Sequence, residues 1–451
     1  MKYDTYSNYK ASDIGWIMDF PAHWELKRLK YVANRSEVKI EAEKDNPLPY
    51  IGLEQVEPWT GRLVKLDDDL VPTGVSNYFT AGDTLFGKLR PYLAKACNVD
   101  FDGLCSSELL VLRGKNYDRK FLLYQLLSHG FINLVDSSTY GSKMPRASWD
   151  FIGICELPLP PLDEQQTIAR FLDTKTAQID ELIAKKRQLI AKLKEKRQAL
   201  IARTVTRGLP PEAAKAAGLE SNPNPEMKDS GVDFLGVVPK TWNVVRLKHV
   251  LNAKKGAIKT GPFGSQLHGS EMLESEIKVF NQRTVIDRDI SSGDNYISLE
   301  KFEELKSFEV FPGDLLVTTR GTIGRCMVVP DGAEKGILHP CLMRLQLNKI
   351  HITDRYLELL IEESGYVIDQ LRLMSNATTI EVIYSESLKE VWLAVPPLNE
   401  QCKIIEYLDR GASKLDALVE RTVLAIARLT EYRQALITSA VTGKIDVRAT
   451  A

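Results

Sequence analysis

Residues 160–173 read PPLDEQQTIARFLD and residues 396–409 read PPLNEQCKIIEYLD, so one phrase stands twice in the chain, 236 residues apart. Two consecutive prolines exclude a helix at their own position. Each proline lacks an N–H group and disfavours helical geometry in the residue before it. We therefore expect the chain to be extended through each proline pair and to start a long helix directly after it.

The residues after the prolines suit a helix start. Asp163 and Asn399 are good N-cap residues, because their side chains can accept hydrogen bonds from free backbone N–H groups. Glu164 and Glu400 follow them, where the positive end of the helix dipole favours an acidic group. The phrase predicts the same local structure at both places.

The repeat extends well beyond the phrase. At the same offset of 236 residues, DRKFLLYQLLSHGFI (118–132) aligns with DRYLELLIEESGYVI (354–368). An earlier block, FPAHWELKRLKYV (20–32), aligns with VPKTWNVVRLKHV (238–250) at an offset of 218. The second copy thus holds 18 more residues between its tryptophan block and its helical end. Such self-similarity indicates an internal duplication.

The chain divides into two similar modules, each an α+β domain followed by a long helix. Residues 208–230, rich in Pro, Asn and Ala and without apolar periodicity, are typical of a linker. The expected order is a first domain, a first long helix, the linker, a second domain, a second long helix and a tail: residues 1–160, 161–207, 208–230, 231–396, 397–443 and 444–451.

Apolar residues recur every seven positions in both predicted helices, as in a coiled coil. The first helix carries two such series, Leu172, Ile179, Leu193 and Leu200, with Ile168, Leu182 and Leu189 alongside. The second carries Leu408, Leu415, Leu429 and Leu436, with Ile404, Leu418 and Ala425 alongside. We expect the helices to pair with each other as an antiparallel coiled coil with pseudo-two-fold symmetry, which would separate the two domains as a ruler. The alternative is that each helix packs only on its own domain.

Each domain contains a predicted β-hairpin that follows a Gly-Asp turn, at residues 81–99 and 312–329. Basic and polar residues on these hairpins and on two further loops suit contacts with phosphates and base edges, although each is also a common solvated surface residue. The candidates for DNA contact are Lys88, Arg90, Lys95, Lys143, Arg146, Lys259, Ser265, Gln266, His268, Arg320 and Arg325.

Other functions find little support in the sequence. The P-loop pattern in GDTLFGKL (82–89) fails at Leu89, where magnesium binding needs Ser or Thr, so we interpret this stretch as a strand. The six cysteines form no C-x-x-C motif and predict neither a metal site nor a disulfide framework. No signal peptide or membrane span is apparent, and we expect a cytoplasmic protein without catalytic residues.

The duplicated phrases, with KRQALI and YRQALI near the helix ends and GWIMDFPAHWELKRLK and DFLGVVPKTWNVVRLK at the module starts, resemble the specificity subunits of type I restriction-modification enzymes. The resemblance covers essentially the whole chain. It implies two target recognition domains, each reading one half of an interrupted, asymmetric DNA site, with the helices setting the spacer.

The resemblance also implies partners. Two methyltransferase subunits would bind S-adenosylmethionine and modify adenine, two ATP-driven translocase and nuclease subunits would complete the enzyme, and this chain itself would bind no cofactor. ATP and magnesium would belong to those partner subunits. Two other interpretations stay open from the residues alone: a coiled-coil scaffold that binds only proteins, and a stand-alone DNA-modifying enzyme.

Overall fold

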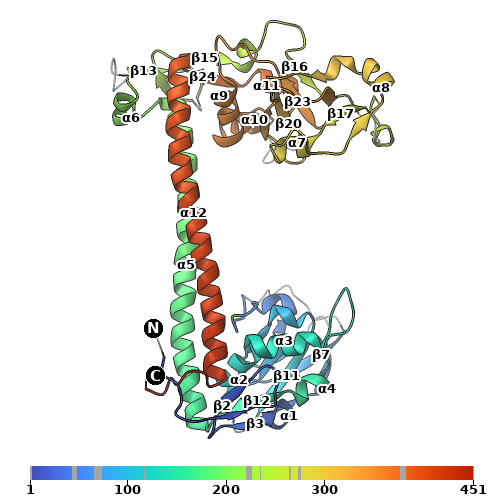
Figure 1. Ribbon diagram of the computed structural model, residues 1–451, viewed down its shortest axis with the longest axis vertical. Coiled ribbons are helices and arrows are strands. Elements are labelled where there is room, and N and C mark those ends of the chain that lie inside the picture. Colours follow the sequence, from blue (N-terminus) through green and yellow to red (C-terminus); the bar gives the residue numbers. More distant parts are fainter. Residues whose placement is uncertain are drawn as a thin grey trace. The chain divides into compact units, whose positions relative to one another are not determined.

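The computed structural model describes residues 3–42, 48–64, 74–115, 117–219, 226–233, 235–263, 266–272, 276–375 and 382–449 (Figure 1). The chain forms two compact units, unit 1 with Met1–Gln188 and Thr422–Ala451, and unit 2 with Leu189–Arg421. Two long helices, α5 (Leu162–Arg207) and α12 (Leu398–Val441), contribute one part to each unit. No helix in the described ranges is long and apolar enough to cross a membrane.

Each unit contains a four-stranded antiparallel sheet of the same order, which carries the predicted hairpin. In unit 1 the order is β4-β11-β8-β9, with bounds Ala33–Arg35, Leu109–Gly114, Thr84–Gly87 and Ala96–Asn98. In unit 2 it is β16-β23-β20-β21, with bounds Ile258–Thr260, Leu342–Leu345, Leu315–Thr318 and Cys326–Val328. The hairpins β8–β9 and β20–β21 are confirmed, and GDTLFGKL supplies strand β8.

A second, mixed sheet of four strands lies in each unit, with the same three central strands but with the fourth strand added at opposite edges. In unit 1, β10 (Gly103–Cys105) pairs parallel with β6 (Tyr50–Ile51) and antiparallel with β7 (Gly74–Phe79). Strand β5 (Lys39–Ala42) pairs with the other edge of β7. In unit 2, β22 (Gly336–Leu338) pairs parallel with β17 (Ile277–Phe280) and antiparallel with β19 (Glu309–Val310). Strand β18 (Tyr296–Ile297) pairs with the other edge of β17.

Two short strand pairs bring the tryptophan block of each module beside the prolines of the phrase. Strand β3 (Glu25–Arg28) pairs with β12 (Glu156–Leu159), which ends just before Pro160. Strand β15 (Asn243–Arg246) pairs with β24 (Trp392–Val395) in the same way. The pairs β1–β2 (Tyr9–Ala11, Asp19–Pro21) and β13–β14 (Met227–Asp229, Val237–Pro239) precede them.

Short helices pack against these sheets and complete the apolar cores. Unit 1 has α1 (Leu29–Val32), α2 (Arg119–Leu126), α3 (His129–Ser137) and α4 (Trp149–Ile154). Unit 2 has α6 (Pro211–Ala216), α7 (Gln282–Ile286), α8 (Leu299–Glu304), α9 (Asp354–Glu358), α10 (Tyr366–Ser375) and α11 (Ser385–Lys389), and a π-helical turn, Leu359–Glu363, follows α9.

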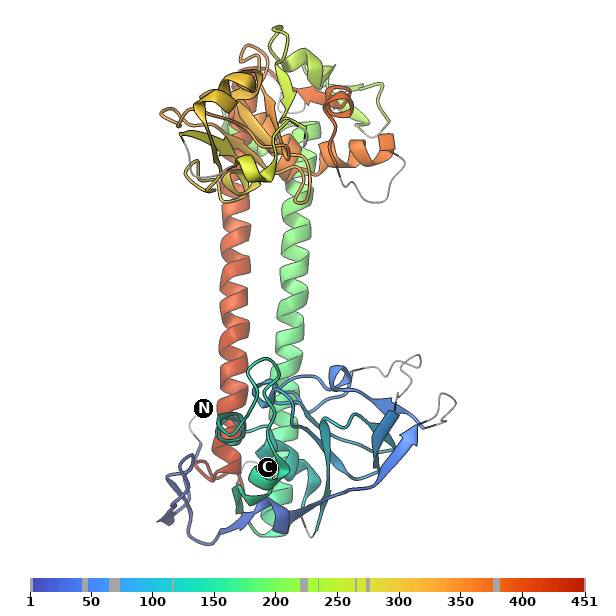
Figure 2. The same ribbon diagram turned by 90° about the vertical axis from the view of Figure 1, so that its right-hand side faces the viewer.

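Within each unit a part of α5 packs against a part of α12 (Figure 2). In unit 1, Leu172, Ile179 and Ile183 share one core cluster with Leu436 and Ala440. In unit 2, Ile201 and Val205 share a cluster with Ile404 and Leu408, and Leu193 and Leu200 of the predicted set are partly buried. Leu429 of the predicted set, in the part of α12 that belongs to unit 1, is partly buried there. The two helix segments in unit 2 run antiparallel. Arg197 of α5 pairs with Asp416 of α12, and Leu200, three residues later in α5, lies against Gly411, five residues earlier in α12.

The predicted companion series is wrong at three leucines. Leu182, Leu189 and Leu418 are 44%, 45% and 47% exposed. The predicted companion residues come three positions after each member of the seven-residue series that contains Leu172 and Leu408. The residues that are buried come four positions after it instead: Thr176 and Ile183 in α5, and Ala412 and Arg433 in α12. Polar residues occupy several of these positions, so a search for leucines alone selected the wrong face.

The predicted N-caps, Asp163 and Asn399, are also wrong, each by two residues. The helices begin at Leu162 and Leu398, so Asp163 and Asn399 lie in the first turn. The first helical hydrogen bonds run from the N–H groups of Gln165 and Gln401 to the carbonyl oxygens of Pro161 and Pro397. A proline is tolerated there because its missing N–H group would have had no helical partner.

Candidate nucleic-acid interface and its anchors

The repeated phrase acts as an anchor in both units through its glutamine. The Nε2 groups of Gln165 and Gln401 donate to the carbonyl oxygens of Pro160 and Pro396, each at 2.9 Å. Their Oε1 atoms accept the backbone N–H groups of Asp118 (3.0 Å) and Thr353 (2.9 Å), the N-cap residues of α2 and α9. Both glutamines are buried. One side chain thus fixes the proline turn, the long helix and a short helix of the domain together.

The glutamate of the phrase holds the tryptophan block in unit 1. Glu164 is buried and accepts hydrogen bonds from the Tyr6 hydroxyl (2.7 Å) and the Trp24 Nε1–H (3.1 Å), and His23 Nε2 lies 2.9 Å from it. Burial, with the hydrogen bond to Glu164, raises the pKa of Tyr6 far above its ordinary value. In unit 2, burial raises the pKa of Glu400.

The C-terminal end of each long helix meets the tryptophan block of one unit. After α12, Gly443 has φ +73° and packs so closely on Pro21 that a Cβ atom would lie 2.2 Å from the Pro21 Cδ. After α5, Gly208 has φ +79° and lies near Pro239 and Trp242. Glycine is needed at both ends because the left-handed conformation ends the helix.

Two equivalent ion pairs join the helices inside the units. In unit 1, Arg433 Nε lies 3.0 Å from Asp180, and its other nitrogens donate to the carbonyl oxygens of Trp59 and Thr60. In unit 2, Arg197 Nε lies 3.2 Å from Asp416, and its Nη2 lies 2.9 Å from Glu363. The two arginines, and likewise the two aspartates, occupy equivalent positions of the repeat. The repeated motifs KRQAL and YRQAL, which contain Arg197 and Arg433, could therefore have pointed to the arginine of each ion pair from sequence.

The hairpin tips carry the candidate DNA-contacting residues, and a second loop pairs with each tip. In unit 1 the Ala147 N–H group donates to the Lys88 carbonyl, and Leu89 pairs with Arg146. In unit 2 the Ile383 N–H group donates to the Thr319 carbonyl, and Arg320 pairs with Val382. The structure therefore brings Lys88, Arg90, Lys143 and Arg146 onto two adjoining loops, where sequence alone gave no reason to group them.

Several of the candidate cations are already engaged within their units. Arg146 Nε lies 3.1 Å from both oxygens of Glu108, and that carboxylate raises the pKa of Arg146. Lys95 Nζ donates to the Leu53 carbonyl, and burial lowers its pKa. Lys259 Nζ lies 3.2 Å from the Ser307 hydroxyl and over the Phe308 ring. Arg325 Nη2 lies 3.1 Å from Glu362.

The remaining candidates differ in exposure. Arg90, Lys143 and Arg320 are exposed, and no carboxylate in the described ranges forms an ion pair with them. Gln266 accepts the Phe263 N–H group, and His268 begins a short 3₁₀ turn, so both are exposed but locally bonded. Ser265 lies outside the described residues. The β16–β23–β20 register places Gly261, which follows β16, at the same end of the sheet as Arg320, which follows β20.

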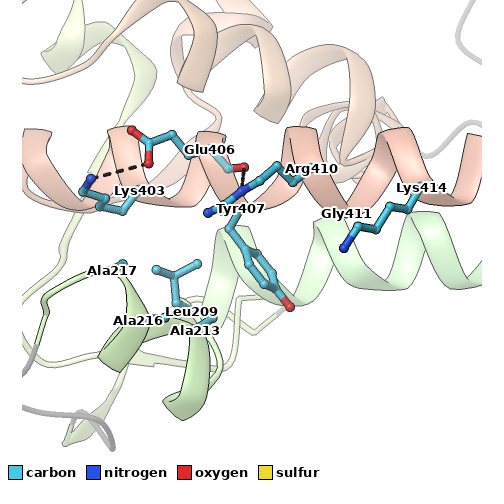
Figure 3. A pocket seen from close by; sticks show the side chains of 10 residues that line it. All are labelled: Leu209, Ala213, Ala216, Ala217, Lys403, Glu406, Tyr407, Arg410, Gly411 and Lys414. Atoms are coloured by element: carbon cyan, nitrogen blue, oxygen red, sulfur yellow. Dashed lines mark hydrogen bonds and ion pairs between the residues drawn. The ribbon is translucent and has the colours of Figure 1, made fainter.

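A groove of about 660 Å³ lies between α6 and α12 in unit 2 (Figure 3). Leu209 and Tyr407 contribute apolar surface, and the cations Lys403, Arg410 and Lys414 line one face of α12. Lys403 pairs with Glu406 at 3.4 Å, and Arg410 Nε donates to the Glu406 carbonyl.

The described residues contain no cluster of side chains that could hold a metal ion.

All six cysteines are free thiols. Burial raises the pKa of Cys97 and of Cys105 to about 12, so neither is a thiolate at neutral pH. Their chemistry is that of core residues.

Comparisons with known proteins agree with this architecture. A family model described as a type I restriction modification DNA specificity domain matches residues 21–192 and 239–422. The MjaVIII specificity subunit of Methanocaldococcus jannaschii is 22% identical over 448 residues, covering 95% of this chain and 94% of that protein. The EcoKI specificity subunit of Escherichia coli K12 is 22% identical over 457 residues, covering 96% and 90%.

Solved structures show the same fold. A chain from a study of complex assembly and conformational transition of the type I R-M system aligns with a TM-score of 0.62 at 20% identity, covering 94% of this chain and 99% of that one. The HsdS subunit of Thermoanaerobacter tengcongensis aligns with a TM-score of 0.50 at 19% identity, covering 94% and 98%. With two matched domains and two long helices, the chain belongs to the DNA specificity subunits of type I restriction-modification systems.

Proposed function

We propose that this subunit reads a bipartite, asymmetric DNA site, with one half read by each domain and the spacer set by the long helices. The observation that carries the proposal is the duplication of one anchor around two different tips. Gln165 and Gln401 make the same bonds, while the tip loops 88–95 and 319–325 share no side-chain pattern. Two domains that are held by the same anchor but carry different tip loops are suited to recognise different base pairs.

The ruler part of the proposal rests on helix length. An uninterrupted helix of 46 residues, as α5 is, extends about 69 Å, comparable to about 20 base pairs of duplex at 3.4 Å each. Inserting seven residues into both α5 and α12 at equivalent seam positions should lengthen the unspecified spacer. An unchanged spacer would contradict the ruler.

The partners we propose are two methyltransferase subunits, which carry S-adenosylmethionine, and two ATP-dependent restriction subunits, with no catalysis and no cofactor in this chain. The exposed leucines support two equivalent protein contacts, because Leu182 and Leu418 occupy the same position of the repeat and both are solvent-exposed. A scaffold that binds only proteins would share these contacts but would not need two different basic tips.

Adenine methylation in host DNA, sequenced with and without this gene, tests the proposal. We expect one two-part motif to lose methylation when the gene is removed, and the purified complex with the methyltransferase to bind that motif over a scrambled duplex. Binding without sequence preference would contradict DNA reading.

A further inference from the structure

The two paired loops at the tip of unit 1, residues 88–95 and 140–147, form one continuous surface joined by backbone hydrogen bonds. The Arg90 N–H group donates to the Pro145 carbonyl at 2.7 Å, and Tyr140 and Arg146 exchange backbone hydrogen bonds of 3.1 and 3.0 Å. With the Ala147–Lys88 bond, these contacts join the loops at several points. We call the five large exposed side chains on them the tip surface: Arg90, Tyr92, Tyr140, Lys143 and Met144.

Three of these five side chains are large and apolar. Tyr140, Met144 and Tyr92 are 63%, 53% and 46% exposed, although all three carry surface that water disfavours. Exposed apolar groups gathered on adjoining loops mark an interaction surface more often than single ones do. Neither loop contains an acidic residue, and Arg90 and Lys143 have no ion-pair partner in the described ranges. The surface therefore combines positive charge with apolar contact area.

Backbone strain concentrates beneath the same surface. Four non-glycine residues of the described chain have positive φ, and three of them are Trp59 (65°), Arg90 (50°) and Ala94 (46°). The Trp59 N–H group donates to the Ala94 carbonyl at 3.0 Å, and Arg433 donates to the Trp59 carbonyl at 2.9 Å. Such strain persists where surrounding contacts over-determine it, and it clusters at functional sites. Here it fixes the direction of the loop that carries Arg90 and Tyr92.

The chemistry of the tip surface selects its ligand. Cations without carboxylates suit phosphate groups. In the major groove, the one apolar group that a base pair presents is the 5-methyl of thymine, which apolar side chains contact directly. Cations beside tyrosine and methionine therefore match a backbone phosphate next to a thymine.

We propose that Tyr92, Tyr140 and Met144 form the base-contacting surface of the first domain and pack against a thymine methyl group, while Arg90 and Lys143 hold the neighbouring phosphates. This inference rests on the proposed DNA-reading function and adds to it the residues and the kind of base they recognise. Arg146 and Lys95, which are engaged by Glu108 and Leu53, position the loops.

Replacing thymine by deoxyuridine removes this methyl group and nothing else. The probe is a duplex that carries the motif mapped by methylation sequencing, with each thymine replaced in turn, bound to the complex of the full chain with its methyltransferase. We expect one replacement in one half-site to weaken binding about fourfold, the contribution of one buried methyl group. In Tyr140→Ala or Met144→Ala that penalty should fall to near one, while replacements in the other half-site keep their effect.

Arg90→Ala is the matched control, because it should weaken binding to all duplexes alike and reduce the salt dependence. A deoxyuridine penalty that is absent in wild type, or that survives in both apolar variants, would overturn the inference. Variants that bind DNA normally but lose the methyltransferase subunit would overturn it too, since the surface would then dock a protein. If wild type does not prefer the mapped motif over a scrambled duplex, the proposed function fails instead.

Discussion

Unit 1 and unit 2 use the same anchor and surround it differently. Glu164 in unit 1 has donors from Tyr6 and Trp24, with His23 beside it, whereas in unit 2 Thr241 stands where the repeat has His23. Burial correspondingly raises the pKa of Glu400. The two copies keep the geometry of the anchor while its electrostatic support has diverged, so the anchor's role is to position the domain on its helix.

The largest difference between the units should come from the two helix ion pairs. Arg433 is 6% exposed and its partner Asp180 14%, whereas Arg197 is 28% exposed and Asp416 57%. Arg433→Met removes the ion pair with Asp180, which keeps only Arg62, and leaves the Trp59 and Thr60 carbonyls without their donor, so it should destabilise unit 1 by about 3 kcal/mol. Arg197→Met should cost about 1 kcal/mol in unit 2. Urea unfolding, with hydrogen exchange followed separately in peptides of each unit, measures both; equal losses would contradict the comparison.

The two anchor glutamates should differ next. Glu164→Ala leaves the Trp24 and Tyr6 donors buried without an acceptor and should cost about 2–3 kcal/mol in unit 1. Because the pKa of Glu400 is raised in the folded state, unit 2 should gain stability as pH falls from neutrality toward about 4.3, the ordinary glutamate value. Glu400→Gln should remove that dependence. A slope that survives in Glu400→Gln would show that another group causes it.

The aspartates of the two Gly-Asp turns provide a third, smaller contrast. Burial of Asp83 is outweighed by hydrogen bonds from Arg113 and Thr80, which lower its pKa, whereas burial dominates at Asp314 and raises its pKa. Asp83→Asn should therefore cost about 1–2 kcal/mol at pH 7, and Asp314→Asn less. The Asp83 contribution is present above about pH 3.9 and is lost as pH falls further. A reversed order of the two losses would argue against this account of the turns.

The smallest effect should be at the exposed leucines. Leu182→Lys and Leu418→Lys replace side chains that keep nearly half of their surface in water, and the lysine stem can cover the same neighbours, so each should change the free energy of unfolding by less than about 0.5 kcal/mol. Ile183→Lys is the matched control, because the neighbouring Ile183 is buried and its loss should destabilise unit 1 strongly. If Leu182→Lys and Ile183→Lys lowered the free energy of unfolding equally, the helix contact through Leu182 that the sequence predicted would be supported after all.

Sequence was sufficient for the duplication, the two long helices and the hairpins, because proline pairs, Gly-Asp turns and a seven-residue period have direct local causes. It failed where position depends on tertiary packing. Thr176 and Arg433 fill seam positions that a search for leucine overlooks. The engaged state of Arg146 depends on Glu108, which no local pattern joins to it. Tyr92, Tyr140 and Met144 emerged only when the structure showed which apolar side chains stay exposed.

The central claim is that each domain reads its own half-site independently on a common anchor. Exchanging residues 33–157 for the corresponding segment of another specificity subunit, followed by sequencing of adenine methylation in the host, tests it most directly. The account predicts that one half of the motif changes while the other half and the spacer stay the same. A change in both halves, or in neither, would contradict it.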